Sequence, residues 1–222
     1  MESTAPAQTP PQSQSPLSRA LFVFALIYGG MTVLAGVLGN KQVDLGPLAV
    51  EAGIFAFLLL VILSSATAEL FGRATANRIV LIGFVPLVLS MALILIVLGL
   101  PAAEEMDPER LSGFQLVLGQ SPRLMIAGII AYGTSQFLNV TIFSALRGKG
   151  EGRLLWVRAG VASMLSQIVD TVLFISIAFY GVFPIGELMV GQMLAKVVLS
   201  AVLVPPLVQM FVTLGRRLDG GK

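Results

Sequence analysis

The sequence predicts an all-α, polytopic membrane protein with six transmembrane helices. Hydrophobic residues make up 56% of the 222 residues and charged residues only 12%. The mean hydropathy is +0.90. Apolar runs long enough to cross a bilayer recur along the chain, separated by polar or basic segments. This composition is that of a membrane protein, so lipid is the expected surrounding for most of the chain.

Two residue types are absent, and their absence narrows the chemistry. Without Cys there is no disulfide framework and no thiol chemistry. Without His there is no His-based acid–base catalysis, and the usual zinc ligand sets are missing. No Gly-rich phosphate loop ending in Lys-Ser or Lys-Thr occurs, and the formal net charge of +2 is too small to indicate nucleic acid. We therefore expect no enzyme, no metal, no cofactor and no nucleic-acid partner.

The elements follow in order. Residues 1–18, mostly Pro, Gln, Ser and Thr, predict a disordered cytoplasmic tail, and residues 19–222 predict one six-helix transmembrane domain. Spans are expected at about 21–38, 48–70, 79–100, 124–146, from around 156 to 180, and 187–214. Between them we expect a polar turn at 40–47, a compact basic loop at 71–78, an acidic loop at 101–123 and a basic, Gly-rich loop at 147–153. Pro86 should kink the third span, and Pro205-Pro206 should break the sixth.

Lys and Arg residues are divided unevenly between the two sides of the predicted domain. The side that carries both termini holds ten: Arg19, Arg73, Arg78, Arg147, Lys149, Arg153, Arg158, Arg216, Arg217 and Lys222. The other side holds three, Lys41, Arg110 and Arg123, and Lys196 lies within the sixth span. Because cytoplasmic loops carry the excess of Lys and Arg, both termini are expected to be cytoplasmic.

One pattern, Ser-Gln-x-x-(Asn/Asp)-x-x-x-Phe, occurs at 135–143 in the fourth span and again at 166–174 in the fifth. On a helix its side chains share one face, so each span carries a polar stripe. The stripes consist of Gln136, Asn139 and Phe143, and of Gln167, Asp170 and Phe174. Both should face inward, because an amide or carboxylate exposed to hydrocarbon is costly. Two matched stripes on antiparallel helices suggest a pseudo-twofold polar cavity; hydrogen bonding between helices alone is the alternative.

Asp170 and Lys196 lie deep in the predicted bilayer, at a level that Gln136 also reaches. An unpaired charge at that depth costs about 2.5–3.5 kcal/mol or more, so an Asp170–Lys196 ion pair is expected. The pair is interpreted as part of a functional site, with a purely stapling role as the alternative. Glu69 lies nearer the cytoplasmic end of the second span, where it is either functional or an interfacial charge.

Several segments closely resemble the queuosine-precursor transporters, also called the VUT family. These are Ser-Ser-Ala-Thr-Ala-Glu-Leu-Phe-Gly at 64–72, the fourth span with its Phe-Ser-Ala-Leu-Arg ending at 143–147, and the segment from Leu-Trp-Val-Arg at 155–158 through the second stripe to 179. Lys196 and Pro122-Arg123 also match the family pattern. The resemblance covers roughly residues 20–215. It implies a bacterial inner-membrane importer of 7-cyano-7-deazaguanine, or of its 7-aminomethyl relative, for tRNA modification.

The resemblance also implies how a purine-like small molecule would bind. A guanine-like edge offers N–H and amino donors to a carboxylate, here Glu69 or Asp170, and a carbonyl to an amide or ammonium. Phe143 and Phe174 are expected to stack on the flat ring. The complete set of candidate substrate-binding residues is Glu69, Gln136, Asn139, Phe143, Gln167, Asp170, Phe174 and Lys196.

Two departures from the family bear on the substrate. Members generally carry Asp at the positions of Ser65 and Asn139, and the loss of two carboxylates favours a neutral ligand over a cationic one. A carrier for another neutral heterocycle is one alternative. A substrate-binding membrane subunit of an energy-coupling-factor transporter, which would need a separate energising module, is another. Small residues at Ala127, Ala131 and Ser135 predict a close helix contact, either inside the bundle or in a homodimer.

Overall fold

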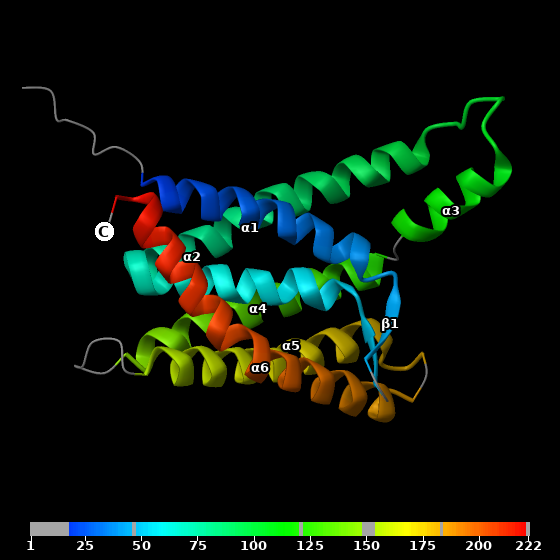
Figure 1. Cartoon of the computed structure of the whole chain (residues 1–222). Coiled ribbons are helices and arrows are strands. Elements are labelled where there is room, and N and C mark those ends of the chain that lie inside the picture. Colours follow the sequence, from blue (N-terminus) through cyan, green and yellow to red (C-terminus); the bar gives the residue numbers. More distant parts are fainter. Residues whose placement is uncertain (1–17, 46–47, 120–121, 148–153, 183, 221–222) are drawn as a thin grey trace, which may run out of the picture.

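The computed structural model describes residues 18–45, 48–119, 122–147, 154–182 and 184–220, so the predicted tail lies outside it except for Ser18. Its helices form one elongated bundle (Figure 1). Five of the helices in these ranges are long and apolar enough to span a membrane: α1 (Arg19–Leu38), α2 (Gly53–Gly99), α4 (Pro122–Ala145), α5 (Leu155–Phe179) and α6 (Gly186–Leu218). A shorter helix, α3 (Pro108–Leu118), precedes α4. The predicted all-α membrane fold is confirmed.

The second of these helices supplies two spans. A straight helix of 47 residues would be about 70 Å long, more than twice the hydrocarbon thickness of a bilayer. The helix is interrupted at Gly72, where φ is 83° and ψ is 165°. Figure 1 shows its first half running through the middle of the bundle and its second half returning beside α1. With both halves counted, the bundle has the six spans that the sequence predicts.

The prediction of a basic loop at 71–78 is wrong, because the chain reverses at Gly72 alone and residues 73–78 are already helical. The backbone conformation at this residue is one that essentially only glycine adopts without strain. Residues such as Arg73 and Arg78 are therefore carried on a helix near the end of the bundle. Polar composition alone made this stretch resemble a loop.

A β-hairpin replaces the expected polar turn and the first turn of the second span. Strands β1 (Gln42–Leu45) and β2 (Leu48–Glu51) pair antiparallel, with Gln42 opposite Glu51. The amide of Ala52 donates to the carbonyl oxygen of Lys41 at 2.7 Å, which closes the base of the hairpin. The hairpin places Glu51 at the entrance of the bundle, directly before α2.

The predicted break at Pro205-Pro206 is also wrong, since α6 continues through both prolines to Leu218. Pro205 is buried and packs against Gly160 of α5, where a methyl side chain in place of the glycine hydrogen would lie 3.6 Å from the proline Cγ. Prolines are tolerated inside transmembrane helices where neighbouring groups satisfy the freed carbonyls. The α2 helix likewise continues past Pro86, and its non-helical backbone is at Gly72.

The two ends of the bundle differ. At the terminus end, Ser18 donates from its hydroxyl to Asp219 Oδ2 at 2.7 Å, and the amide of Ala20 donates to Asp219 Oδ1 at 3.1 Å. The Ser18 hydrogen bond, with help from that amide, lowers the pKa of Asp219, so this contact between the two termini is kept at neutral pH and is lost as the pH falls through that lowered pKa. The hairpin end carries β1, β2 and α3 (Figure 1).

The polar stripes face the interior, as predicted. Ser135, Gln136, Asn139, Gln167 and Asp170 are all buried, whereas large apolar side chains are exposed along the outer faces of the helices. Ala127 and Ala131 are buried on the same helix as Ser135, which hydrogen-bonds to α5. The close contact expected in the fourth span is therefore inside the bundle.

Substituting Gly72 should destabilise the fold. A Gly72→Ala variant is expected to lose about 1–3 kcal/mol of stability, because a side chain there strains the backbone of the reversal. Thermal unfolding in detergent measures the loss. Gly30→Ala is the matched control, since Gly30 is exposed in α1 and an added Cβ meets nothing within 4 Å. Equal unfolding temperatures for the two variants would contradict the assignment of the reversal to Gly72.

Candidate functional site

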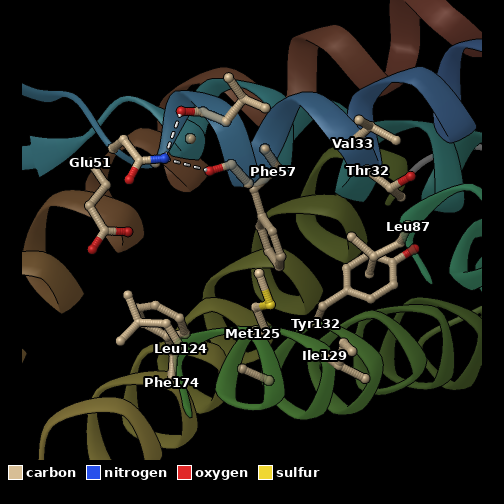
Figure 2. Close-up of a pocket in the computed structure, with 18 of the residues that line it drawn as sticks. Thr32, Val33, Glu51, Phe57, Leu87, Leu124, Met125, Ile129, Tyr132 and Phe174 are labelled. Atoms are coloured by element: carbon tan, nitrogen blue, oxygen red, sulfur yellow. Dashed lines mark hydrogen bonds between the residues drawn. The ribbon is translucent and has the colours of Figure 1, made fainter. Parts of the chain in front are cut away.

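A cavity of about 220 Å³ occupies the half of the bundle nearer the hairpin end. It lies between α1, α2 and α4, and its walls are mostly apolar side chains. Figure 2 shows Glu51 and Phe57 on one side of the space and Leu124, Met125 and Phe174 on the other. The tip of α3 contributes two lining residues near the mouth. A mostly apolar cavity with a few polar groups is the usual form of a small-molecule site.

The deepest polar contact of the cavity is an ion pair between α5 and α6. Lys196 Nζ donates to Asp170 Oδ2 at 3.1 Å, and both residues line the cavity. The hydroxyl of Ser135, on α4, lies 3.2 Å from Asp170 Oδ1 and 3.2 Å from the carbonyl oxygen of Tyr132, so its one proton can be donated to either. The predicted pair is confirmed, and the two side chains are only 7% and 11% exposed. We refer to Asp170 and Lys196 as the floor pair.

Aromatic rings form part of the cavity wall above the floor pair. Tyr132 contacts Phe57 and Phe84 edge-to-face, with ring centroids 6.4 and 5.0 Å apart, and its hydroxyl donates to the Tyr28 hydroxyl at 3.0 Å. Phe174 lies one turn along α5 from Asp170 and also lines the cavity. Such rings offer faces and edges to a flat ligand.

A group of hydroxyls and amides joins α2 to α4, and we call it the amide cluster. Asn139 Nδ2 lies 3.1 Å from Ser64 Oγ and 3.0 Å from Ser65 Oγ. The Ser64 hydroxyl is also within reach of Gln136 Oε1, at 3.2 Å, and of a carbonyl of its own helix. A single hydroxyl proton serves one of these acceptors at a time, so the cluster is incompletely satisfied.

Several buried polar atoms near the amide cluster have no hydrogen-bond partner in the described part of the chain. They are Gln136 Nε2, Asn139 Oδ1, both side-chain polar atoms of Gln167, and Ser200 Oγ. Asn139 follows Ser135 by four residues on α4, and Gln167 precedes Asp170 by three residues on α5. Both therefore lie about 5 Å nearer the terminus end than the Ser135–Asp170 contact. None of these residues lines the cavity. Each buried polar atom without a hydrogen-bond partner costs about 1–3 kcal/mol. A conformation or a ligand that supplies the missing hydrogen bonds would therefore stabilise this part of the bundle.

A second ion pair closes the bundle nearer the terminus end. Arg158 Nη1 donates to Glu69 Oε2 at 2.9 Å, and Arg158 Nε donates to the carbonyl oxygen of Phe143 at 3.1 Å. The guanidinium also lies over the Phe143 ring, 4.2 Å from its centroid. We call these three residues the terminus-side closure. Along α5 it lies about 18 Å from Asp170.

The eight residues predicted from the sequence therefore fall into separate groups. Asp170, Phe174 and Lys196 line the cavity. Gln136 and Asn139 belong to the amide cluster with Gln167 near their level, and Glu69 and Phe143 belong to the terminus-side closure. The pseudo-twofold cavity expected between the two stripes is wrong, because the α4 stripe meets α2 instead of the cavity.

Four residues that sequence reasoning left out take part in these groups. Arg158 had been counted as a charge near a loop, yet it is 5% exposed and paired with Glu69. Tyr132 precedes Ser135 by three residues and so shares its helix face, a spacing that could have indicated it. Phe57 and Glu51 line the cavity as well. Glu51 could be placed there only once the hairpin was known.

A polytopic helical bundle with a cavity that ends on an intramembrane ion pair has the features expected of a membrane transporter. The comparisons agree. Residues 51–210 match the family described as "Putative vitamin uptake transporter", and the chain belongs to this family. No solved structure matches the chain.

Two curated relatives are similar over most of their length. One is the "Probable queuosine precursor transporter" of Bacillus subtilis (strain 168), 29% identical over 182 residues, which are 80% of this chain and 78% of that protein. The other is the "Queuosine precursor transporter" of Escherichia coli (strain K12), 24% identical over 168 residues, or 76% of this chain and 72% of that protein. The resemblance seen in the sequence is confirmed.

The floor pair should be more sensitive to loss of one partner than to loss of both. Lys196→Met leaves the Asp170 carboxylate buried without a counter-ion and is expected to lower stability by about 3 kcal/mol. Adding Asp170→Asn should restore most of the loss, because the remaining groups are neutral. Thermal unfolding of the single and double variants in detergent tests this. If the double variant were less stable than Lys196→Met, the charge-pairing role of the floor pair would be contradicted.

Proposed function

We propose that this chain imports a queuosine precursor, 7-cyano-7-deazaguanine or a related neutral 7-deazaguanine, across the bacterial inner membrane for tRNA modification. The observation that carries the proposal is the floor pair at the bottom of a mostly apolar cavity. The names of the two relatives support the substrate class. With both termini in the cytoplasm, as the Lys and Arg distribution predicts, the cavity faces the periplasm.

The cavity suits a flat, neutral molecule. Asp170 and Lys196 carry opposite charges in direct contact, so the floor adds no net charge. Glu51 adds one negative charge to the cavity wall, and its oxygens can accept hydrogen bonds from the N–H groups of a neutral ligand. Tyr132 and Phe174 supply apolar ring surface above it. The volume of about 220 Å³ is below the range of roughly 300–1,000 Å³ for drug-sized ligands, as expected for a small bicyclic compound.

The order of the polar groups supports an alternating-access mechanism. Substrate bound above the floor offers hydrogen bonds that compete with the contact between Asp170 and Lys196. Once the floor opens, the next polar groups along the proposed route are the Gln136 amide nitrogen, the Gln167 amide and the Asn139 amide oxygen, which have no partner among the described residues. Separation of Glu69 from Arg158 would then open the cytoplasmic side. Transporters commonly hold their substrate near the bilayer midplane between such gates.

Import can be tested through queuosine in tRNA. Bacteria lacking both precursor synthesis and their own importer would be supplied with low concentrations of 7-cyano-7-deazaguanine, and tRNA queuosine would be measured. The parent chain should restore modification, and Asp170→Asn should abolish it because the floor loses its charge pairing. Asp44→Asn, at an exposed acid of β1, is the control and should behave like the parent chain.

Two outcomes would count against this function. Well-expressed parent chain that leaves tRNA unmodified would exclude this precursor and turn attention to other neutral heterocycles. Restoration in cells, but no uptake by purified chain in proteoliposomes, would favour a subunit that needs a separate energising module.

The amides beneath the floor should matter for transport more than for binding. Gln167→Leu removes two unpaired polar atoms that do not line the cavity. Equilibrium binding of precursor to the detergent-solubilised variant should stay within about threefold of the parent, whereas the rate of uptake in proteoliposomes should fall at least about tenfold, as for loss of a hydrogen bond of about 1.4 kcal/mol. Gln209→Leu, on the exposed face of α6, is the control. Equal loss of binding and uptake would place Gln167 in the initial site instead.

A further inference from the structure

Glu51 is a carboxylate in the cavity wall that the predicted site did not include. It is the last residue of β2 and is positioned by the hairpin register and by the hydrogen bond that closes the hairpin base. Gln192 Nε2, on α6, donates to Glu51 Oε1 at 3.3 Å. The ion pairs found in the described ranges join other acids, so Glu51 faces the cavity without a cationic partner there.

Gln192 positions this carboxylate from behind. The residue is 4% exposed and does not line the cavity, and its one contact with Glu51 is the hydrogen bond from Nε2 to Oε1. The two oxygens of a carboxylate keep further acceptor capacity when one of them accepts a single hydrogen bond. Glu51 therefore presents two adjacent acceptors to the cavity, and such a pair complements a ligand edge with two adjacent donors.

The Asp170 carboxylate of the floor pair is less available to a ligand than Glu51 in this state. One of its oxygens accepts from Lys196 and the other lies within hydrogen-bond distance of the Ser135 hydroxyl. Lys196 keeps further N–H donors and lines the cavity, so the floor offers a donor to the ligand. Glu69, the other acid predicted to accept from the ligand, is paired with Arg158 in the terminus-side closure.

The spacing places the Glu51 acceptors and the Lys196 donor along one edge of a small molecule. Gln192, which holds Glu51, and Lys196 are four residues apart on α6, so they share a face and are separated by about 6 Å along the helix axis. In a 2-amino-lactam the carbonyl, the ring N–H and the amino group follow one another along a single edge. The carbonyl would meet Lys196, and the two donors beside it would meet Glu51.

We infer that Glu51, positioned by Gln192, selects the substrate by its adjacent ring N–H and exocyclic amino group, the donor side of a 2-amino-lactam edge. This inference rests on the proposed function and adds its specificity determinant. A site that hydrogen-bonds a particular group rejects an analogue lacking it, because the acceptors of the site are then left unpaired. A ligand without the amino group should therefore be discriminated against.

The test compares 7-cyano-7-deazaguanine with its 2-deamino analogue in proteoliposomes, each measured for half-saturating concentration and rate of uptake. The parent chain should prefer the amino compound by about ten- to a hundredfold, as for a hydrogen bond to a charged group. In Glu51→Gln this preference should fall to about threefold or less, mainly through weaker uptake of the amino compound. Gln192→Leu should reduce the preference in the same direction. Glu105→Gln, at an exposed acid before α3, should keep the parent preference.

A ratio between two ligands on one protein cancels differences in the amount of folded carrier. The inference is overturned, with the proposed function intact, if Glu51→Gln and Gln192→Leu both discriminate as strongly as the parent chain. It also fails if the parent chain takes up both compounds equally. If the parent chain takes up neither, the proposed function fails and this inference fails with it.

Discussion

The contact between Asp170 and Lys196 sets the depth of everything polar in this bundle. Neither charge is tolerated alone within lipid, so α5 and α6 must bring the two side chains to one level, and Ser135 brings α4 to the same place. Helical geometry then places the remaining groups. Glu51 and Gln192 lie about one turn above, and Gln167 with the amide cluster lies about one turn below. The polar groups of the interior thus follow one another along the bundle axis, and apolar residues that face the lipid surround them.

The members of that series differ in how completely they are satisfied. The two ion pairs are each supported by additional hydrogen bonds, whereas the level between them contains buried amide atoms without partners in the described residues. In a rigid protein such atoms would only lower stability, and folded proteins keep few of them. A carrier has at least two conformations, and groups that are unmet in one can be met in the other. The incomplete satisfaction of this level is consistent with a bundle that moves.

Much of the fold and part of the site could be predicted from the sequence. The six spans follow from apolar length, and the ion pair follows because intramembrane charges are rare and must find each other. The pattern of Gln136 and Asn139 predicted an inward face correctly, but helical periodicity does not say which neighbouring helix that face meets. The sequence predicted Arg158 as a cytoplasmic charge at the start of the fifth span, because basic residues usually mark the ends of spans. Its burial depends on the tertiary pairing with Glu69, which no local pattern encodes.

The reversal at Gly72 has a consequence for how the protein enters the membrane. A single residue joins the two arms of α2, so almost no chain is available to separate them while the protein is being synthesised. Once the turn has formed, the position of the first arm fixes the direction and the starting point of the second. We therefore expect residues 53–99 to insert as a helical hairpin, and in the orientation that the sequence predicts Arg73 and Arg78 lie on the cytoplasmic side.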